Sequence, residues 1–366
     1  MSKAVGKPAS KGRKTFELGG KRIPLGASRT IDLTISETYS GHPVVMPVHV
    51  MRAPQVGPVV CVTASVHGDE INGMGIVREL VQHPGFKLSK GTLVLVPVVN
   101  VLGFERFSRY MPDRRDLNRS FPGSGGGSLT ARVASSVFEQ VIRKSDYGID
   151  LHSAAVRRTN FPNVRANLDQ PETRMLAEAF GTELVLHGEG PEGSLRRAAC
   201  DIGVPTIILE AGEVWKIEPG VVEVGLRGIR NVLITLGMVR GRRKNPRYQA
   251  LVRDTTWIRA VHGGVLRFHV APGDVVSKDQ PLATNTDLVG CERNLLLSSA
   301  DGVVLGMTTL PAVKPGDPVC HIARLDEAQL KAVKSSLNQS TTGKLRDHLV
   351  TNVTVSDHAD SPDSAI

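Results

Sequence analysis

The sequence predicts an α/β domain, with a largely parallel or mixed sheet flanked by helices, followed by a smaller all-β domain. Over the first two thirds of the chain, short valine-rich runs alternate with amphipathic segments, the order expected of β-α-β units. After a basic linker, short β-like runs follow one another between glycine- and proline-containing turns. The length of 366 residues is ample for two cores.

The chain divides into four segments. Residues 1–20 are a basic tail that we expect to be disordered, and residues 21–245 form the α/β domain. Residues 250–330 form the β-domain, and the polar end, 340–366, is again expected to be disordered. A short helix-like piece begins near residue 326.

The elements of the α/β domain follow from residue spacing. β-branched clusters on either side of the turn at 39–43 predict a hairpin, and the other strands are short apolar runs bounded by Gly and Pro. Helices are predicted where apolar residues recur at helical spacing. The expected strands are 31–35, 44–52, 58–66, 91–99, 147–151 and 205–210, and the expected helices are 70–82, 128–144, 172–180 and 220–238.

Residues 257–324 resemble the small β-barrel of biotinyl and lipoyl carrier domains. The same kind of turn occurs twice, as APGD at 271–274 and KPGD at 314–317. A carrier domain needs a lysine at a hairpin tip, and the corresponding stretch GCERNL, at 290–295, has none. A structural or substrate-capping role is therefore expected.

Bulk composition excludes several classes of protein. No apolar run approaches the roughly 18 residues of a membrane span, and the N-terminus lacks the apolar core of a secretory signal. Four scattered cysteines form neither a CxxC pair nor a disulfide framework, so we expect a cytoplasmic protein. Much of the net charge of +9 lies in the leading tail and the linker at 240–247. Neither has interleaved aromatics or a nucleic-acid motif, so no nucleic-acid partner is expected, although positive potential favours an anionic substrate.

The segment VTASVHGDE, at 62–70, predicts a catalytic metal site. A buried strand ends there and leaves His67 and Glu70 facing one point, and a later strand ends at His152. Two imidazoles and one carboxylate at strand ends leave a coordination position open for water, as in catalytic rather than structural zinc sites. The sequence therefore predicts a zinc hydrolase.

Four segments in order extend this pattern: HGDE at 67–70, DLNR at 116–119, DLH at 150–152 and EAGE at 210–213. Over about residues 25 to 330 the chain resembles the succinylglutamate desuccinylase/aspartoacylase family, a branch of the zinc carboxypeptidase clan. The resemblance implies a zinc-carboxypeptidase-like fold. It also implies that His67, Glu70 and His152 bind Zn²⁺.

The resemblance assigns further roles. It makes Glu210 the catalytic general base, in preference to Glu213, because the apolar run PTIIL ends directly at Glu210. It implies that Asn118 and Arg119 bind the substrate carboxylate, since arginine offers two parallel donors.

Two more positions complete the expected site. Asp116 is expected behind the metal, accepting a hydrogen bond from His67. Arg109 is expected to hold a second carboxylate or to polarise the scissile carbonyl; Arg115 and Arg196 or Arg197 are alternatives. Asp69 is interpreted as a helix cap. His187, His262, His269 and His321 lack ligand spacing and are expected in the core or on the surface.

We therefore expect a zinc-dependent hydrolase that cleaves the amide bond of an N-acyl amino acid or a related small carboxylate-bearing amide. One alternative is a zinc carboxypeptidase acting on small peptides, and another is a non-catalytic binding module. The expected partner is the small-molecule substrate, with homo-oligomerisation compatible with any of these activities. No G-x-S-x-G elbow surrounds Ser120 or Ser153, so a serine hydrolase is not expected.

Overall fold

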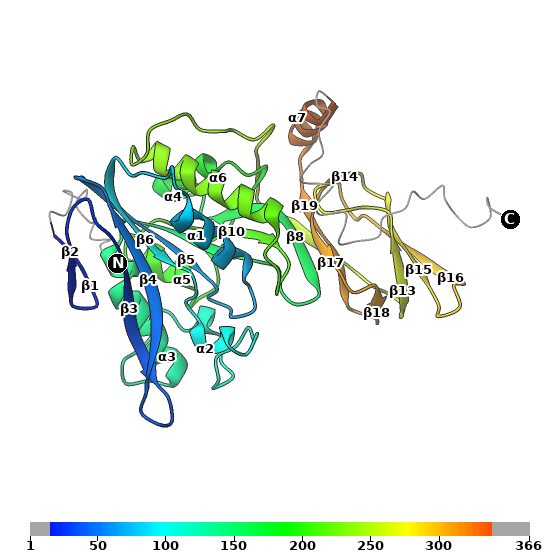
Figure 1. Cartoon of the computed structure of the whole chain (residues 1–366). Helices are drawn as coiled ribbons and strands as arrows, with labels where there is room; N and C mark the ends of the chain where they lie inside the picture. Colours follow the sequence, from blue (N-terminus) through cyan, green and yellow to red (C-terminus); the bar gives the residue numbers. More distant parts are fainter. Residues whose placement is uncertain (1–14, 339–366) are drawn as a thin grey trace, which may run out of the picture.

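The computed structural model describes residues 15–338 (Figure 1). The predictions of disorder for residues 1–14 and 340–366 lie outside the described residues. Disorder was also expected as far as residue 20, and this is wrong from residue 16 onward. Strand β1 (Phe16–Leu18) pairs with β2 (Lys21–Ile23), and Phe16 and Leu18 are buried in the core. Together with Ile23 of β2, they anchor this ribbon in the core.

A mixed sheet forms the centre of the molecule. Its first part contains β3 (Ser28–Glu37), β4 (Pro43–Arg52), β5 (Gln55–Ala64), β6 (Lys90–Val96), β7 (Tyr147–His152), β8 (Arg158–Ala166) and β10 (Thr206–Gly212). Strands β6, β5, β7 and β10 are parallel neighbours in that order, and β8 lies antiparallel beside β10. The predicted hairpin is present as β3 and β4.

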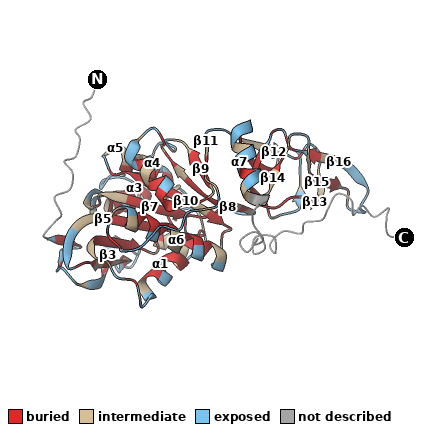
Figure 2. Ribbon diagram, turned by 90° about the horizontal axis from the view of Figure 1, so that it is seen from above, coloured by how far each residue is buried: buried red, intermediate tan, exposed pale blue. Residues whose placement is uncertain are grey.

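Helices cover both faces of this sheet (Figures 1 and 2). Helices α1 (Asn72–Gln82), α4 (Pro171–Phe180) and α6 (Pro219–Thr235) belong to one apolar cluster, and α3 (Leu129–Gln140) and α5 (Leu195–Asp201) belong to the other. Val60 and Val62 of β5 point into the first cluster, while Val59 and Cys61 point into the second. Both faces of β5 are buried from residue 59 to residue 64, which explains the run of apolar residues there.

The sequence predictions for this region were confirmed with shifted ends. Helix α1 begins at Asn72 rather than at residue 70, and the helix expected at 128–144 ends as α3 at Gln140 before a short 3₁₀ turn. The elements that were missed include β8, β9 (Leu184–His187) and α5. Strand β8 reads RTNFPNVRA, and its polar residues and proline conceal a strand that the structure buries between β10 and its other neighbours.

The C-terminal part is all-β, as predicted, apart from a final helix. Strands β12 (Thr255–Arg259), β14 (Val275–Val276), β17 (Gly302–Thr308) and β19 (Pro318–Arg324) extend the main sheet, and β11 (Ala250–Val252) pairs with β9. Strands β13 (Gly264–Phe268), β15 (Pro281–Thr286), β16 (Glu292–Leu297) and β18 (Ala312–Val313) form a second sheet. The two sheets enclose a separate apolar cluster, and α7 (Glu327–Asn338) follows.

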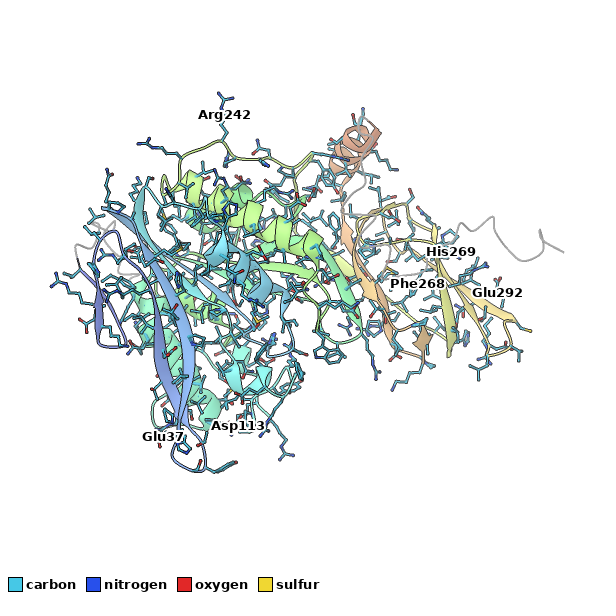
Figure 3. All side chains as sticks on the ribbon, viewed as in Figure 1. Glu37, Asp113, Arg242, Phe268, His269 and Glu292 are labelled. Carbon is cyan, nitrogen blue, oxygen red and sulfur yellow. The ribbon has the colours of Figure 1, made fainter. Side chains whose placement is uncertain are left out.

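The main sheet continues without a break from one part of the chain into the other. Strand β8 pairs with β10 on one side and with β17 on the other, so among the described residues the sheet reaches thirteen strands. The basic linker between the two parts is exposed, and Arg242 projects away from the molecule (Figure 3). Within residues 15–338, no helix has the length and apolar character required to cross a membrane.

Candidate active site

The parallel strands bring the predicted motifs to one edge of the sheet. His152 is the last residue of β7, and Glu210 lies beside it as its partner in β10. The loop after β5 carries His67 and Glu70 to the same edge. Gly68 permits this loop to pass close to α2 (Val101–Phe104), because a Cβ at residue 68 would stand 2.1 Å from the carbonyl carbon of Gly103.

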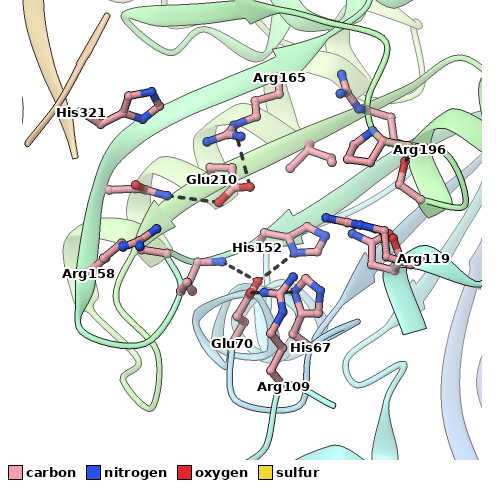
Figure 4. A pocket seen from close by; sticks show the side chains of 18 of the residues that line it. His67, Glu70, Arg109, Arg119, His152, Arg158, Arg165, Arg196, Glu210 and His321 are labelled. Carbon is pink, nitrogen blue, oxygen red and sulfur yellow. Dashed lines mark hydrogen bonds and ion pairs between the residues drawn. The ribbon is translucent and has the colours of Figure 1, made fainter. Parts of the chain in front are cut away.

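His67, Glu70 and His152 converge on one buried point (Figure 4). The Nδ1 atom of His67 lies 2.6 Å from Oε1 of Glu70, and Nδ1 of His152 lies 2.8 Å from Oε2. One candidate ligand atom from each residue falls within 4.8 Å of the other two. The sequence predicted this set, and these three residues could hold a metal ion.

On the side away from Glu70, each imidazole contacts a second carboxylate. Nε2 of His152 lies 2.8 Å from Oδ2 of the buried Asp150, and Nε2 of His67 lies 3.2 Å from Oδ1 of Asp116. Thr63 donates to the remaining oxygen of Asp150 at 2.7 Å. Each ring is therefore oriented with Nδ1 toward Glu70, the arrangement by which proteins fix metal-binding histidines. The predicted contact between Asp116 and His67 is present.

The charges in this cluster strongly shift the pKa values of its own side chains. Burial by itself lowers the pKa of His152, but the charges of Asp150 and Glu70 outweigh it and raise the pKa well above its ordinary value. The same balance raises the pKa of His67, through Glu70 and Asp116. Burial opposes ionisation of Glu70, yet the two imidazoles lower the pKa of its carboxyl. The buried cluster thus provides an ionised carboxylate between two basic nitrogens.

Arg109 reaches this cluster from the loop that follows α2. Its Nη2 donates to Oδ2 of Asp116 at 3.0 Å, and its Nη1 lies 3.3 Å from Oε1 of Glu70. The residue lines the pocket, as predicted for a substrate-binding arginine, but two carboxylates already engage its guanidinium. Asp69, interpreted as a helix cap, caps nothing: Ile71 is the N-cap residue of α1, and Oδ1 of Asp69 is buried without a partner among residues 15–338.

Asn118 and Arg119 line the pocket from a short 3₁₀ turn, Leu117–Arg119. Oδ1 of Asn118 accepts a hydrogen bond from the backbone N–H of Leu195 at 2.9 Å, and this contact fixes the orientation of the side-chain amide. Nη1 of Arg119 donates to the carbonyl oxygen of Asn118 at 2.7 Å. Both predicted residues therefore stand at the pocket wall with donors to offer.

The structure distinguishes the two glutamates of the fourth motif. Glu210 lines the pocket, where Nδ2 of Asn160 donates to its Oε2 at 3.2 Å and Nε of Arg165 lies 3.8 Å from its Oε1. Glu213 does not line the pocket and instead accepts from Lys216 and from Thr309 of the C-terminal part. The geometry thus favours Glu210 as the candidate base.

These residues surround a cavity of about 330 Å³. Arg119 and Arg196 lie on one side of Glu210 and the candidate metal cluster, and Arg158 and His321 lie on the opposite side (Figure 4). Among the alternative arginines, Arg196 lines the cavity, whereas Arg115 and Arg197 do not. Burial lowers the pKa of Arg196 to about 10.

Several pocket residues were not predicted from the sequence. They include Arg158, Asn160 and Arg165 of β8, together with Trp257 and His321 from the C-terminal strands. His321, expected in the core or on the surface, is buried, but it also lines the cavity and stacks on Trp257 with ring centroids 4.3 Å apart. Spacing gave no signal, because β8 reaches the site by pairing with β10, and the C-terminal strands reach it by the pairing of β17 with β8.

Comparison with known proteins identifies the family to which this fold and candidate site belong. Residues 56–236 match the model of the succinylglutamate desuccinylase/aspartoacylase catalytic domain. The chain belongs to the succinylglutamate desuccinylase/aspartoacylase family, as its motifs predicted.

The match to known relatives covers most of this chain and nearly all of each relative. The chain is 27% identical over 336 residues to N-alpha-acetyl-L-2,4-diaminobutyric acid deacetylase of Halomonas elongata, covering 84% of this chain and 98% of the relative. The product-bound structure of the ectoine utilization protein EutE (DoeB) from Ruegeria pomeroyi matches with a TM-score of 0.71 and 23% identity, over 83% of this chain and 98% of that one. A family member from Rhodobacter sphaeroides matches with a TM-score of 0.69 and 24% identity, over 81% and 95%.

Proposed function

We propose that this protein is a zinc-dependent hydrolase that cleaves the amide bond of a small N-acyl amino acid. The observation that carries the proposal is the buried His67–Glu70–His152 set, which faces a strand-end glutamate across an arginine-lined cavity. Membership of a deacylase family supports the same reaction.

The donor set fits zinc. Two imidazole nitrogens and one carboxylate are ligands that Zn²⁺ prefers, and three protein ligands leave a position for water or substrate. The outer contacts from Asp116 and Asp150 are those that metal-binding histidines require. When bound, the ion would supply a Lewis acid that polarises a carbonyl and lowers the pKa of water.

The remaining residues have roles that their positions support. Glu210, on a rigid strand, accepts the proton of the attacking water and returns it to the leaving nitrogen. Asn118 and Arg119 hold the carboxylate of the amino acid through neutral and charged donors. The size of the cavity favours small acyl amino acids over longer peptides.

The positive charge of the cavity suggests how the substrate of this protein differs from that of the Halomonas relative. That relative is named for an N-acetylated diaminobutyric acid, whose side chain carries an amino group. In this chain Arg119, Arg158, Arg165 and Arg196 all line the cavity. Like charges placed together without screening are costly, so an acidic substrate is favoured over a cationic one.

Metal analysis and a substrate panel test the proposal. We expect about one zinc per purified chain and loss of activity on chelation, as for a single three-ligand catalytic site. N-acetyl-L-aspartate, N-acetyl-L-glutamate and N-succinyl-L-glutamate should have kcat/KM values about 10-fold or more above that of N-alpha-acetyl-L-2,4-diaminobutyrate. Absence of metal, or cleavage of dipeptides alone, would overturn the proposal.

A further inference from the structure

We infer that Asn160 is a positioning residue for Glu210, and that Gly306 of the C-terminal sheet provides the space its amide needs. The inference rests on the proposed role of Glu210 as the base. It assigns to the C-terminal part of the chain a specific contribution to the geometry of the catalytic carboxylate.

Asn160 stands where the two parts of the sheet meet. In strand β8 it is paired with Gly212 of β10 on one side and with Gly306 of β17 on the other. Its side chain is partly exposed in the cavity, and its Nδ2 donates to Oε2 of Glu210 at 3.2 Å. The donor therefore comes from a rigid strand held on both edges.

Gly306 is required for space rather than for backbone freedom. A Cβ at this position would lie 2.6 Å from Oδ1 of Asn160 and 2.8 Å from the carbonyl oxygen of Thr159. The carbonyl belongs to the paired strand and cannot move away easily, so any side chain at residue 306 would press on Asn160. A glycine in a strand interior often marks such a close approach.

The hydrogen bond from Asn160 orients the carboxylate of Glu210 without adding a charge. A primary amide donates without carrying charge, so it can fix one carboxylate oxygen without forming an ion pair. With Oε2 held by Asn160, the other oxygen, Oε1, is left for proton transfer, and its nearest cation, Arg165 Nε, lies 3.8 Å away. General base catalysis requires the accepting oxygen within hydrogen-bond reach of its proton, which makes this orientation important.

A neighbouring asparagine provides a matched control. Asn163 of the same strand is fully buried, and its Nδ2 donates to the backbone oxygens of Phe161 and Glu210 at 2.8 and 3.3 Å. Its contacts support the backbone of the strands, whereas the contact of Asn160 is to the carboxylate itself. Loss of Asn163 should lower stability, and loss of Asn160 should lower turnover.

The test is a double-mutant cycle on the full-length, zinc-loaded protein with its best panel substrate. Asn160→Ala should lower kcat about 10-fold or more while KM stays within about 2-fold. Asn160→Asp should lower it further, because a second carboxylate then faces Glu210. In a Glu210→Gln background neither change should cause additional loss, since both act through that residue. Gly306→Ala should reproduce the fall in kcat.

Two results would overturn the inference: kcat within about 2-fold of wild type in Asn160→Ala, or losses that multiply fully in the Glu210→Gln background. If wild-type protein cleaves no panel substrate, the proposed function fails on its own. Crystal structures of wild type and Asn160→Ala then decide the positioning role. A rotated or disordered Glu210 carboxylate in the variant supports it, and an unchanged carboxylate refutes it.

Discussion

At the scale of residues, both imidazoles of the candidate metal site lie between two carboxylates. His67 lies between Glu70 and Asp116, and His152 lies between Glu70 and Asp150. The backbone N–H of Ser153 also donates to Oε2 of Glu70 at 3.0 Å. The rings and the central carboxylate are thus oriented by protein contacts alone, and such preorganisation reduces the cost of assembling a site around a ligand.

Replacement of Glu210 by glutamine tests its chemical role. Glutamine keeps the shape of the side chain but cannot accept a proton, so kcat should fall by at least about 10²-fold while the zinc content stays unchanged. Metal analysis and steady-state kinetics measure the two quantities. Glu213→Gln is the control, because Glu213 is paired with Lys216 and Thr309 outside the cavity and should retain most activity. Full turnover in Glu210→Gln would remove this residue from the mechanism.

His321 should make the protein sensitive to mild acid. Burial, together with the positive charges of Arg165 and Arg158, lowers the pKa of His321 to about 4. The unfolded chain, with an ordinary histidine pKa near 6.5, therefore binds more protons between these values, and stability falls as the pH drops through this window. Between pH 7 and pH 5, protonation of this residue in the unfolded chain should lower the free energy of unfolding by roughly 2 kcal/mol.

Urea unfolding of wild type and His321→Phe at the two pH values measures the effect. The variant keeps a planar ring against Trp257 but cannot take up a proton, so its stability should fall less on acidification. An equal loss of stability in both proteins would show that protonation of His321 does not contribute.

At the scale of elements, the close packing of α6 depends on two glycines. A Cβ at Gly228 would stand 2.1 Å from Cε1 of the buried Phe180 in α4, and one at Gly225 would stand 2.3 Å from Cδ1 of Ile76 in α1. The glycines therefore let one long helix lie against two others. This requirement explains why glycine is retained inside a helix despite its low helix propensity.

Gly228→Ala should destabilise the protein by about 1 to 3 kcal/mol, the usual cost of overpacking, even though alanine favours helix by about 1 kcal/mol. Thermal or urea unfolding measures the change. Glu223→Ala, on the exposed face of the same helix, should stay within about 0.5 kcal/mol of wild type. A stabilised Gly228→Ala would show that propensity outweighs the contact with Phe180.

At the scale of the whole molecule, the two parts of the chain share an apolar core. Phe161, Leu184 and Leu186 of the N-terminal part form one buried cluster with residues of the C-terminal part, among them Val303 and Leu305. The sheet also crosses between the parts at β8 and β17. The division of the chain near residues 245–250 therefore remains a prediction about sequence composition, and the parts are physically interdependent.

A chain that ends after Gln249 should therefore not form a stable monomer. It would leave residues 158–160 of β8 as an unpaired strand edge and would uncover the apolar cluster at Phe161, both of which promote aggregation. Size-exclusion chromatography and light scattering of the truncated and full-length proteins provide the measurement. A monodisperse truncated protein with native activity would show that the first part is autonomous.

Much of the fold and of the candidate metal cluster could be predicted from the sequence. Strands β5, β6, β7 and β10 are buried on both faces, so their apolar runs are unbroken, and parallel strands place their carboxyl ends together. This local signal indicated that His67, Glu70 and His152 meet at one edge of the sheet, and the resemblance to the family added Glu210. It did not reveal β8, whose sequence is polar on the side that faces the cavity.

By itself the sequence determined the alternating order of strands and helices, the family, and the residues that can bind a metal. Only the tertiary structure decided which of the alternative arginines lines the cavity. It also decided that Glu210 rather than Glu213 faces the cavity, and that His321 belongs to the cavity wall. The physical reason is sequence separation, because periodicity and motif spacing carry information only about residues that are near one another along the chain. The pairing of β8 with β17 instead joins residues about 150 positions apart, such as Asn160 and Gly306.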